Sequence, residues 1–165
     1  MNWEDFKQNV EGWAKDRGIY EHSTAVAQLL KAVSEVGELA DAVVKKDTDG
    51  LADAIGDVAV CLVNYAAMKD VPFSLPEVYG QLRQRQNLNA ILAHLLIEIG
   101  DELRVTEGLS KREVATYNFV LGAVLKLKLI AEVNGLDFAQ CCEFAWNEIK
   151  DRKGHMIEGG VFVKE

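Results

Sequence analysis

The sequence predicts an all-α protein with a four-helix-bundle-like core and additional peripheral helices. Only two prolines, Pro72 and Pro76, interrupt the 165 residues. Long stretches repeat apolar residues at helical spacing. Hydrophobic residues make up 49% of the chain, which is typical of a globular protein. A chain of this length can bury a substantial core, so we expect a single domain over residues 1–165.

Apolar spacing and capping signals locate the individual elements. Ser23 or Thr24 is suited to cap the second helix, and Ser110 followed by Glu113 is a capping-box pattern for the sixth. We expect helices at about 3–16, 24–46, 51–68, 74–84, 89–106, 110–133 and 138–152, with a turn at 47–50 and an extended tail at 159–163. The predicted buried stripe of the second helix contains Val26, Leu29, Leu30, Val33, Val36, Ala40 and Val43.

A weak internal repeat runs through the chain. The segment Glu35-Val36-Gly37-Glu38 is echoed by Glu98-Ile99-Gly100-Asp101. One interpretation is a duplicated helix pair, with repeats at about 24–80 and 88–152 and pseudo-twofold symmetry. The other is a chance likeness between amphipathic helices of similar length.

Charge and cysteine content exclude several classes of protein. The net charge of −8 disfavours binding to nucleic acid or to an anionic membrane, because both need a basic surface. Cys61, Cys141 and Cys142 are odd in number and form no CxxC pair, so we expect reduced, buried thiols. The chain opens on a polar amphipathic segment, and we expect no apolar run that approaches the roughly 20 residues of a membrane span. We therefore expect a cytoplasmic protein that does not associate with membranes.

Two pairs of carboxylates carry the chemical prediction. Glu35 and Glu38 are three positions apart and share a helical face, as do Asp53 and Asp57 at a spacing of four. A glycine stands beside each pair, although glycine inside a helix costs roughly 1 kcal/mol relative to alanine. Facing acids across a tight turn repel, and a hard divalent cation removes that repulsion. The alternative is that these acids are solvated or pair with Lys31, Lys45 and Lys46.

The same residues resemble the MazG-like nucleotide pyrophosphohydrolase family. Its pattern is ExxE, a spacer and ExxD, which Glu35, Glu38 and Asp57 match. The sequence departs from the pattern at Ala54, where the family usually has glutamate, and Asp53 is the expected substitute. The segments 13–19, 147–154 and 160–165 are similar to short, phage-type members, whereas residues about 80–133 match poorly.

The resemblance implies hydrolysis of a nucleoside triphosphate to a monophosphate and pyrophosphate. It implies Mg²⁺, or Mn²⁺, bound by Glu35, Glu38, Asp53 and Asp57, with Glu38 as the first choice of general base and Glu35 as the second. The implied substrate contacts come from a family asparagine and from the C-terminal motif: Asn64, Asn147, Lys150, Arg152 and Lys153. We expect the second repeat to have lost its metal, since Thr116 and Val120 stand where the first repeat has Asp53 and Asp57.

Three other functions compete with this one. A phosphoribosyl-ATP pyrophosphohydrolase would use the same chemistry, and the departure at Ala54 leaves room for a non-catalytic nucleotide-binding regulatory protein. A di-iron carboxylate bundle needs ExxH motifs, and no histidine follows a glutamate by three residues. The expected partners are the nucleoside triphosphate and a second copy of the chain in a dimer.

Overall fold

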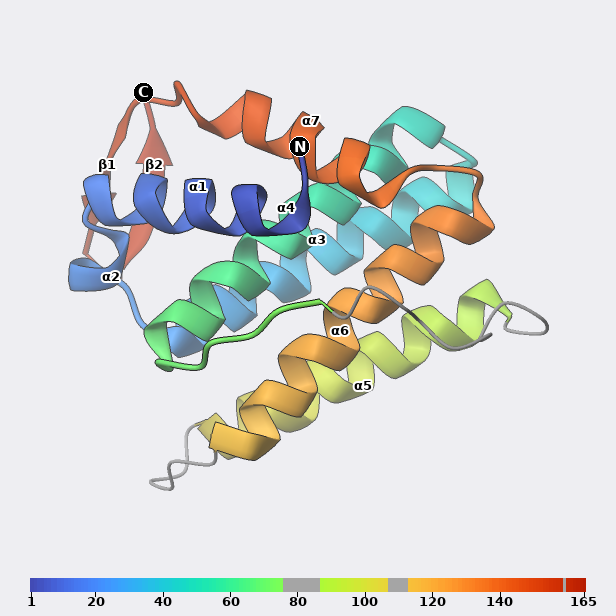
Figure 1. Ribbon diagram of the computed structural model, residues 1–165, viewed down its shortest axis with the longest axis horizontal. Coiled ribbons are helices and arrows are strands. Elements are labelled where there is room, and N and C mark those ends of the chain that lie inside the picture. Colours follow the sequence, from blue (N-terminus) through green and yellow to red (C-terminus); the bar gives the residue numbers. More distant parts are fainter. Residues whose placement is uncertain (76–86, 107–112, 159) are drawn as a thin grey trace.

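Helices build almost all of the protein, which confirms the all-α prediction. The computed structural model describes residues 1–75, 87–106, 113–158 and 160–165. Its elements in chain order are α1 (Trp3–Asp16), α2 (Ile19–His22), α3 (Ala25–Lys45), α4 (Thr48–Met68), α5 (Leu88–Thr106), α6 (Glu113–Val133), α7 (Phe138–Ile149), β1 (Gly154–Ile157) and β2 (Val161–Lys164) (Figure 1).

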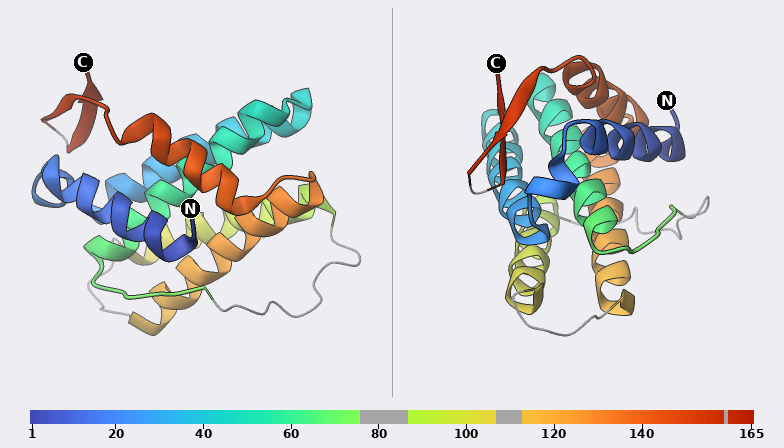
Figure 2. Two further views of the ribbon diagram at one scale, coloured as in Figure 1. Left: turned by 45° about the horizontal axis from the view of Figure 1, so that its top comes forward. Right: turned by 90° about the vertical axis from the view of Figure 1, so that its left-hand side faces the viewer.

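Four long helices form the core of the bundle. The helices α3 and α4 pair with each other, α5 and α6 form a second pair, and the two pairs meet where α3 packs on α5 and α4 packs on α6. The helices α1 and α7 cover the other side of α4 (Figure 2). A buried carboxylate, Glu102 on α5, joins the pairs by accepting hydrogen bonds from Tyr65 of α4 at 2.5 Å and Thr116 of α6 at 3.0 Å.

The two helix pairs have similar bounds along the chain. The helix α5 begins 63 residues after α3, and α6 begins 65 residues after α4. This spacing is what a duplicated helix pair would produce, and it places Glu98 on α5 where Glu35 stands on α3. Duplication and the single-domain organisation stay predictions.

Local capping explains where the helices begin. The side chain of Thr24 accepts a hydrogen bond from the Ala27 amide, as predicted, and Asp137 caps α7 in the same way. The predicted turn at 47–50 is wrong, because Asp47 caps α4 by accepting from the Gly50 amide. The connection between α3 and α4 is therefore only Lys46, in a left-handed conformation, and Asp47.

The buried stripe of α3 differs from the prediction. Leu29 and Val36 are buried as expected, but Leu30 and Val33 are exposed. The buried face instead contains Leu29, Ala32, Glu35, Val36, Leu39 and Ala42. Small residues on this face allow α4 to approach α3 closely. The buried face of α3 is turned relative to the predicted one, so it includes the carboxylate of Glu35.

The chain ends differ from the prediction in two ways. The last helix stops at Ile149 rather than at about residue 152, and the extended tail is one strand of a hairpin that pairs Gly154 with Lys164 and Ile157 with Val161. The short helix α2 was not predicted. Ser74 and Leu75 are not helical, while the rest of the predicted helix at 74–84 and the Ser110 cap lie outside the described residues.

The expectation that no apolar run approaches the length of a membrane span is wrong. Two helices are long and apolar enough by length and composition: α4, with mean hydropathy 1.4, and Val114–Val133 of α6, with mean hydropathy 1.5. About 72% of the apolar window of α4 is buried inside the protein, against 44% for α6. Core helices pass this test too, and α4 packs against four other helices. The three cysteines are free and buried, as predicted.

Candidate functional site

Four carboxylates gather where α3 and α4 pack together. Glu35 is buried and pairs with Lys31 one turn earlier on α3. Asp53 and Asp57 on α4 are half-buried, and Glu38 is exposed. The connection at Lys46 and Asp47 is short, and it places Asp53 within electrostatic reach of Glu35 and Glu38, and Asp57 within electrostatic reach of Glu35.

Burial and mutual repulsion perturb the two aspartates. The pKa of Asp57 is raised to about 7, first because the carboxyl is removed from water and then because Glu35 and Asp53 are negatively charged. The guanidinium of Arg152 and the ammonium of Lys31 partly offset that rise in pKa. The pKa of Asp53 is raised by burial and then by Glu148, Glu35 and Glu38. These groups therefore lie within electrostatic reach of one another.

The C-terminal end of α7 supplies a further carboxylate and a cation. Glu148 and Arg152 lie one turn apart and form an ion pair at 3.8 Å, and both charges act on Asp53. Sequence reasoning assigned no role to Glu148, although it lies inside the motif at 147–154. The spacing of four between Glu148 and Arg152 was the available signal.

A glycine explains how α7 comes so close to α4. A Cβ atom at Gly56 would lie 2.5 Å from the Cβ of Ala145 and 2.6 Å from the carbonyl oxygen of Cys141. Only glycine permits this contact, so Gly56 is required in α4 for the close packing of α7. A Cβ at Gly37 would meet nothing within 4 Å, so the face of α3 beside Glu38 is open.

The carboxylates fit a divalent metal by chemistry. All four are oxygen donors, which Mg²⁺ prefers, and the raised pKa values of Asp53 and Asp57 reflect burial and then neighbouring negative charge that a cation would neutralise. Within the described residues, however, no three His, Cys, Asp or Glu side chains lie close enough to hold a metal ion. Lys31 holds Glu35, and Glu38 extends to solvent. The predicted ligand set Glu35, Glu38, Asp53 and Asp57 therefore stays a prediction.

The predicted substrate residues divide into two groups. The positive charge of Arg152 lowers the pKa values of Asp53 and Asp57, which partly offsets their rise. Lys150 and Asn147 are exposed and bind each other at 2.8 Å, and Lys153 is exposed at the start of the hairpin. Asn64 is buried, and its side-chain oxygen accepts a hydrogen bond from the Tyr20 hydroxyl at 3.0 Å. That bond attaches α2 to α4, while the predicted contact between Asn64 and substrate stays a prediction.

Arg17 fastens the end of α7 to α1. Its guanidinium donates hydrogen bonds to the carbonyl oxygens of Arg152 at 3.0 Å and Lys150 at 3.1 Å. The same group lies over the ring of Trp13, 5.0 Å from its centroid. Arg17 lies in the segment 13–19 that resembles short, phage-type members, but the sequence predicted no role for it. Its contacts hold the backbone from which Arg152 reaches the acids.

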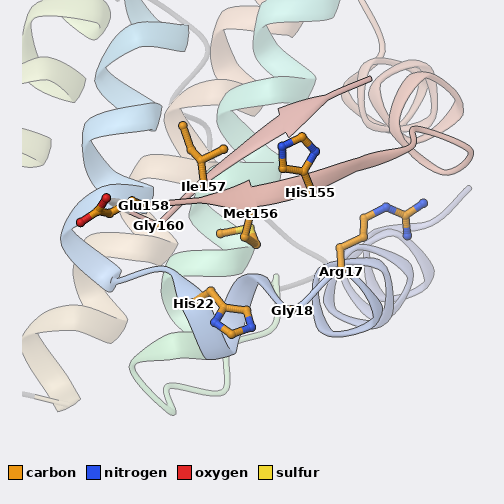
Figure 3. A pocket seen from close by; sticks show the side chains of 8 residues that line it. All are labelled: Arg17, Gly18, His22, His155, Met156, Ile157, Glu158 and Gly160. Carbon is orange, nitrogen blue, oxygen red and sulfur yellow. The ribbon is translucent and has the colours of Figure 1, made fainter.

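A cleft of about 640 Å³ opens between the hairpin and the corner where α1 meets α2 (Figure 3). Its lining includes Arg17, His22, His155, Met156 and Glu158. The hairpin turn closes one end, since a Cβ at Gly160 would lie 2.7 Å from the carbonyl oxygen of His22. No sequence pattern predicts this cleft, because its walls come from segments far apart in the chain.

The second helix pair neutralises its acid differently. Glu98 on α5, the counterpart of Glu35, binds the ammonium of Lys126 on α6 at 2.8 Å. Asp101, the counterpart of Glu38, is exposed and lies 3.6 Å from Arg104. A protein cation thus stands beside Glu98, and the expected loss of metal from this pair stays a prediction.

Comparisons with known proteins point to the first helix pair. The MazG nucleotide pyrophosphohydrolase domain matches residues 22–87, which include α3, α4 and all four predicted ligands. An uncharacterized 18.2 kDa protein from the rep-hol intergenic region of Haemophilus phage HP1 (strain HP1c1) is 37% identical over 71 residues. That alignment covers 43% of this chain and 44% of the phage protein, so the chain matches less than half of its curated relative's length.

No solved structure matches the chain significantly. The match to the domain falls on the two helices that carry the acidic cluster, and the helical fold agrees with it. Residues 22–87 of the chain therefore resemble the MazG nucleotide pyrophosphohydrolase domain.

Proposed function

We propose that this protein is a Mg²⁺-dependent nucleoside triphosphate pyrophosphohydrolase that releases a nucleoside monophosphate and pyrophosphate. The observation that carries the proposal is the meeting of two groups at one place. The carboxylates of α3 and α4 lie in the segment that matches the MazG domain, and the charge of Arg152, three residues beyond α7, acts on two of them. Acids that bind a metal and a guanidinium that binds phosphate are the parts this reaction needs.

The residues take distinct roles in this proposal. Glu35, Glu38, Asp53 and Asp57 would hold the Mg²⁺ or Mn²⁺ ion, which would neutralise the triphosphate and lower the pKa of a water molecule. The exposed carboxylate of Glu38 accepts a proton from the attacking water. Glu35 is less suited to that role, because it is buried and paired with Lys31.

The phosphate contacts come from the other side of the site. Arg152 stabilises the negative charge that moves onto the leaving oxygen as the P–O bond of the α–β bridge breaks. The water oxygen bonds to phosphorus, and its proton passes to the carboxylate. Asp53 is the substitute for the glutamate that position 54 lacks, and this is supported by its electrostatic coupling to Glu35, Glu38 and Glu148.

A nucleotide panel tests the proposal. Purified protein is incubated with each ribo- and deoxyribonucleoside triphosphate and with phosphoribosyl-ATP, with and without Mg²⁺, and both products are quantified. We expect monophosphate and pyrophosphate in equal amounts from at least one substrate, and only with metal. Release of orthophosphate alone, or no turnover of any substrate, would reject the proposal; binding without turnover would favour a regulatory protein.

A matched pair of variants assigns any activity to the first helix pair. Glu38→Gln removes the proposed base, whereas Asp101→Asn makes the corresponding change on α5. We expect Glu38→Gln to lose at least about a hundredfold in kcat, as is usual for a general base. Asp101→Asn removes only an exposed ion pair and should keep the wild-type rate.

A further inference from the structure

We propose that the cleft between the hairpin and α2 binds the nucleoside half of the substrate, its base and sugar. This inference rests on the proposed function, because it locates the part of the nucleotide that does not react. The cleft volume of about 640 Å³ falls in the usual range for small-molecule sites. The predicted substrate residues account for phosphate contacts and leave the nucleoside without a site.

Two contacts place the cleft next to the acidic cluster. Arg17 lines the cleft and also donates to the carbonyl oxygen of Arg152, whose side-chain charge acts on Asp53 and Asp57. At the other side, α2 is fixed to α4 by the hydrogen bond between Tyr20 and Asn64. Asn64 lies two helical turns beyond Asp57, about 10 Å along α4. One nucleotide can therefore reach from the cleft to the carboxylates.

The lining suits a base and a sugar. The imidazoles of His22 and His155 and the guanidinium of Arg17 present flat faces on which a base can stack. Met156 provides apolar surface beside them (Figure 3). The carboxylate of Glu158 can accept hydrogen bonds from sugar hydroxyls or from an exocyclic amine. A free phosphate would instead need several cations, and the lining contains one guanidinium and one carboxylate.

The hairpin fixes the shape of the cleft. Met156 and Phe162 pack against the core, and the ring of Phe162 contacts Trp13 edge-on at 5.8 Å. On β1 the intervening residues His155 and Ile157 are exposed. Met156 and His155 are neighbours on β1, so the packing of Met156 fixes the strand that carries His155.

Kinetics of a double variant test the inference. His22→Ala/His155→Ala removes both imidazoles from exposed positions, and His94→Ala removes an exposed imidazole on α5 as the matched control. We expect the double variant to lose at least about tenfold in kcat/KM, mainly through KM, and to discriminate less between bases. Its Mg²⁺ dependence should equal that of the wild type, because the carboxylates are untouched.

Failure of the inference differs visibly from failure of the proposed function. If the wild type hydrolyses nucleotides and the double variant keeps its kcat/KM and base preference, the nucleoside lies elsewhere. If the wild type hydrolyses none, the proposed function fails, and this inference falls with it.

Imidazole resonances give a direct measurement that needs no metal. Titration of the wild type with nucleoside monophosphate in EDTA should shift the signals of His22 and His155 and leave that of His94 in place. Saturable inhibition by the monophosphate without such shifts would overturn the assignment.

Discussion

Asp57 couples the stability of the fold to pH. Its pKa is raised to about 7 by burial and by the charges of Glu35 and Asp53. A carboxyl whose pKa is higher in the folded than in the unfolded state stabilises the fold fully below the unfolded pKa. That contribution is lost as pH rises from about 4 to about 7, because the folded protein must then ionise an acid in an unfavourable place.

Asp57→Asn should therefore stabilise the metal-free protein at high pH. We expect a gain on the order of 1–2 kcal/mol at pH 8, a value reduced to allow for partial exposure of the carboxyl, and no gain at pH 4. Thermal unfolding in EDTA at both pH values measures it. Addition of Mg²⁺ at pH 8 should raise the melting temperature of the wild type more than that of the variant. Equal melting temperatures at pH 8 in EDTA would show that Asp57 ionises normally.

Two glycines inside helices should respond oppositely to alanine. Gly56→Ala introduces a methyl group 2.5 Å from the Cβ of Ala145 and should destabilise the fold by about 1–3 kcal/mol. Gly37→Ala meets no neighbour and should stabilise it by up to roughly 1 kcal/mol through helix propensity. Chemical denaturation measures both. A destabilised Gly37→Ala would mean that the open face of α3 is filled in solution.

At the scale of elements, α1 supports the site through Arg17. Arg17→Ala removes two hydrogen bonds to the last turn of α7, so Arg152 loses its fixed position. We expect a fall in kcat/KM of about tenfold, and destabilisation of about 1–3 kcal/mol. Arg17→Lys keeps the charge without the planar fork and should recover stability more fully than activity. If Arg17→Lys restores activity and stability in parallel, Arg17 is only structural.

The sequence predicted the long helices well and their faces less well. Thr24 and the apolar spacing locate α3 and α6 to within a few residues at the ends that the structure describes. The burial of α3 was misjudged because Leu30 and Val33 satisfy the helical period, while the partner helix α4 packs on Ala32, Leu39 and Ala42. The extended tail at 159–163 anticipated β2, whereas α2, β1 and the pairing of the hairpin were not predicted, since they depend on tertiary contacts such as Gly160 against His22.

The candidate site shows the same division. The ExxE spacing and the two-residue connection were enough to place Asp53 within electrostatic reach of Glu35 and Glu38, and Asp57 within reach of Glu35. The participation of Glu148, Arg17 and the cleft was not predictable, because α7 and the hairpin lie about 90 residues beyond α4 and no local periodicity relates them. The close contact of Gly56 with α7 is the structural reason that α7 lies beside the acids of α4.

Across the whole molecule, each helix pair sets a lysine beside a carboxylate: Lys31 beside Glu35 on α3, and Lys126 of α6 beside Glu98 of α5. Lys126→Met should leave the charge of Glu98 partly buried and unpaired, and destabilise the protein by about 1–3 kcal/mol. It should leave kcat/KM unchanged, because the reaction belongs to α3 and α4. Denaturation and steady-state kinetics measure the two effects, and Lys126→Met/Glu98→Gln should recover part of the stability. A large loss of kcat/KM in a folded Lys126→Met protein would place chemistry in the second pair.

The central claim is that acids from α3 and α4 and a cation from α7 form one phosphate-cleaving site. The most direct test compares kcat/KM for triphosphate hydrolysis in Arg152→Ala and in Arg104→Ala, an exposed arginine on α5 that pairs only weakly with Asp101. Loss of a charge-assisted phosphate contact worth roughly 1.5–3 kcal/mol predicts a tenfold to hundredfold fall for Arg152→Ala, with little change in melting temperature, and no fall for Arg104→Ala. Full activity in Arg152→Ala would contradict the account.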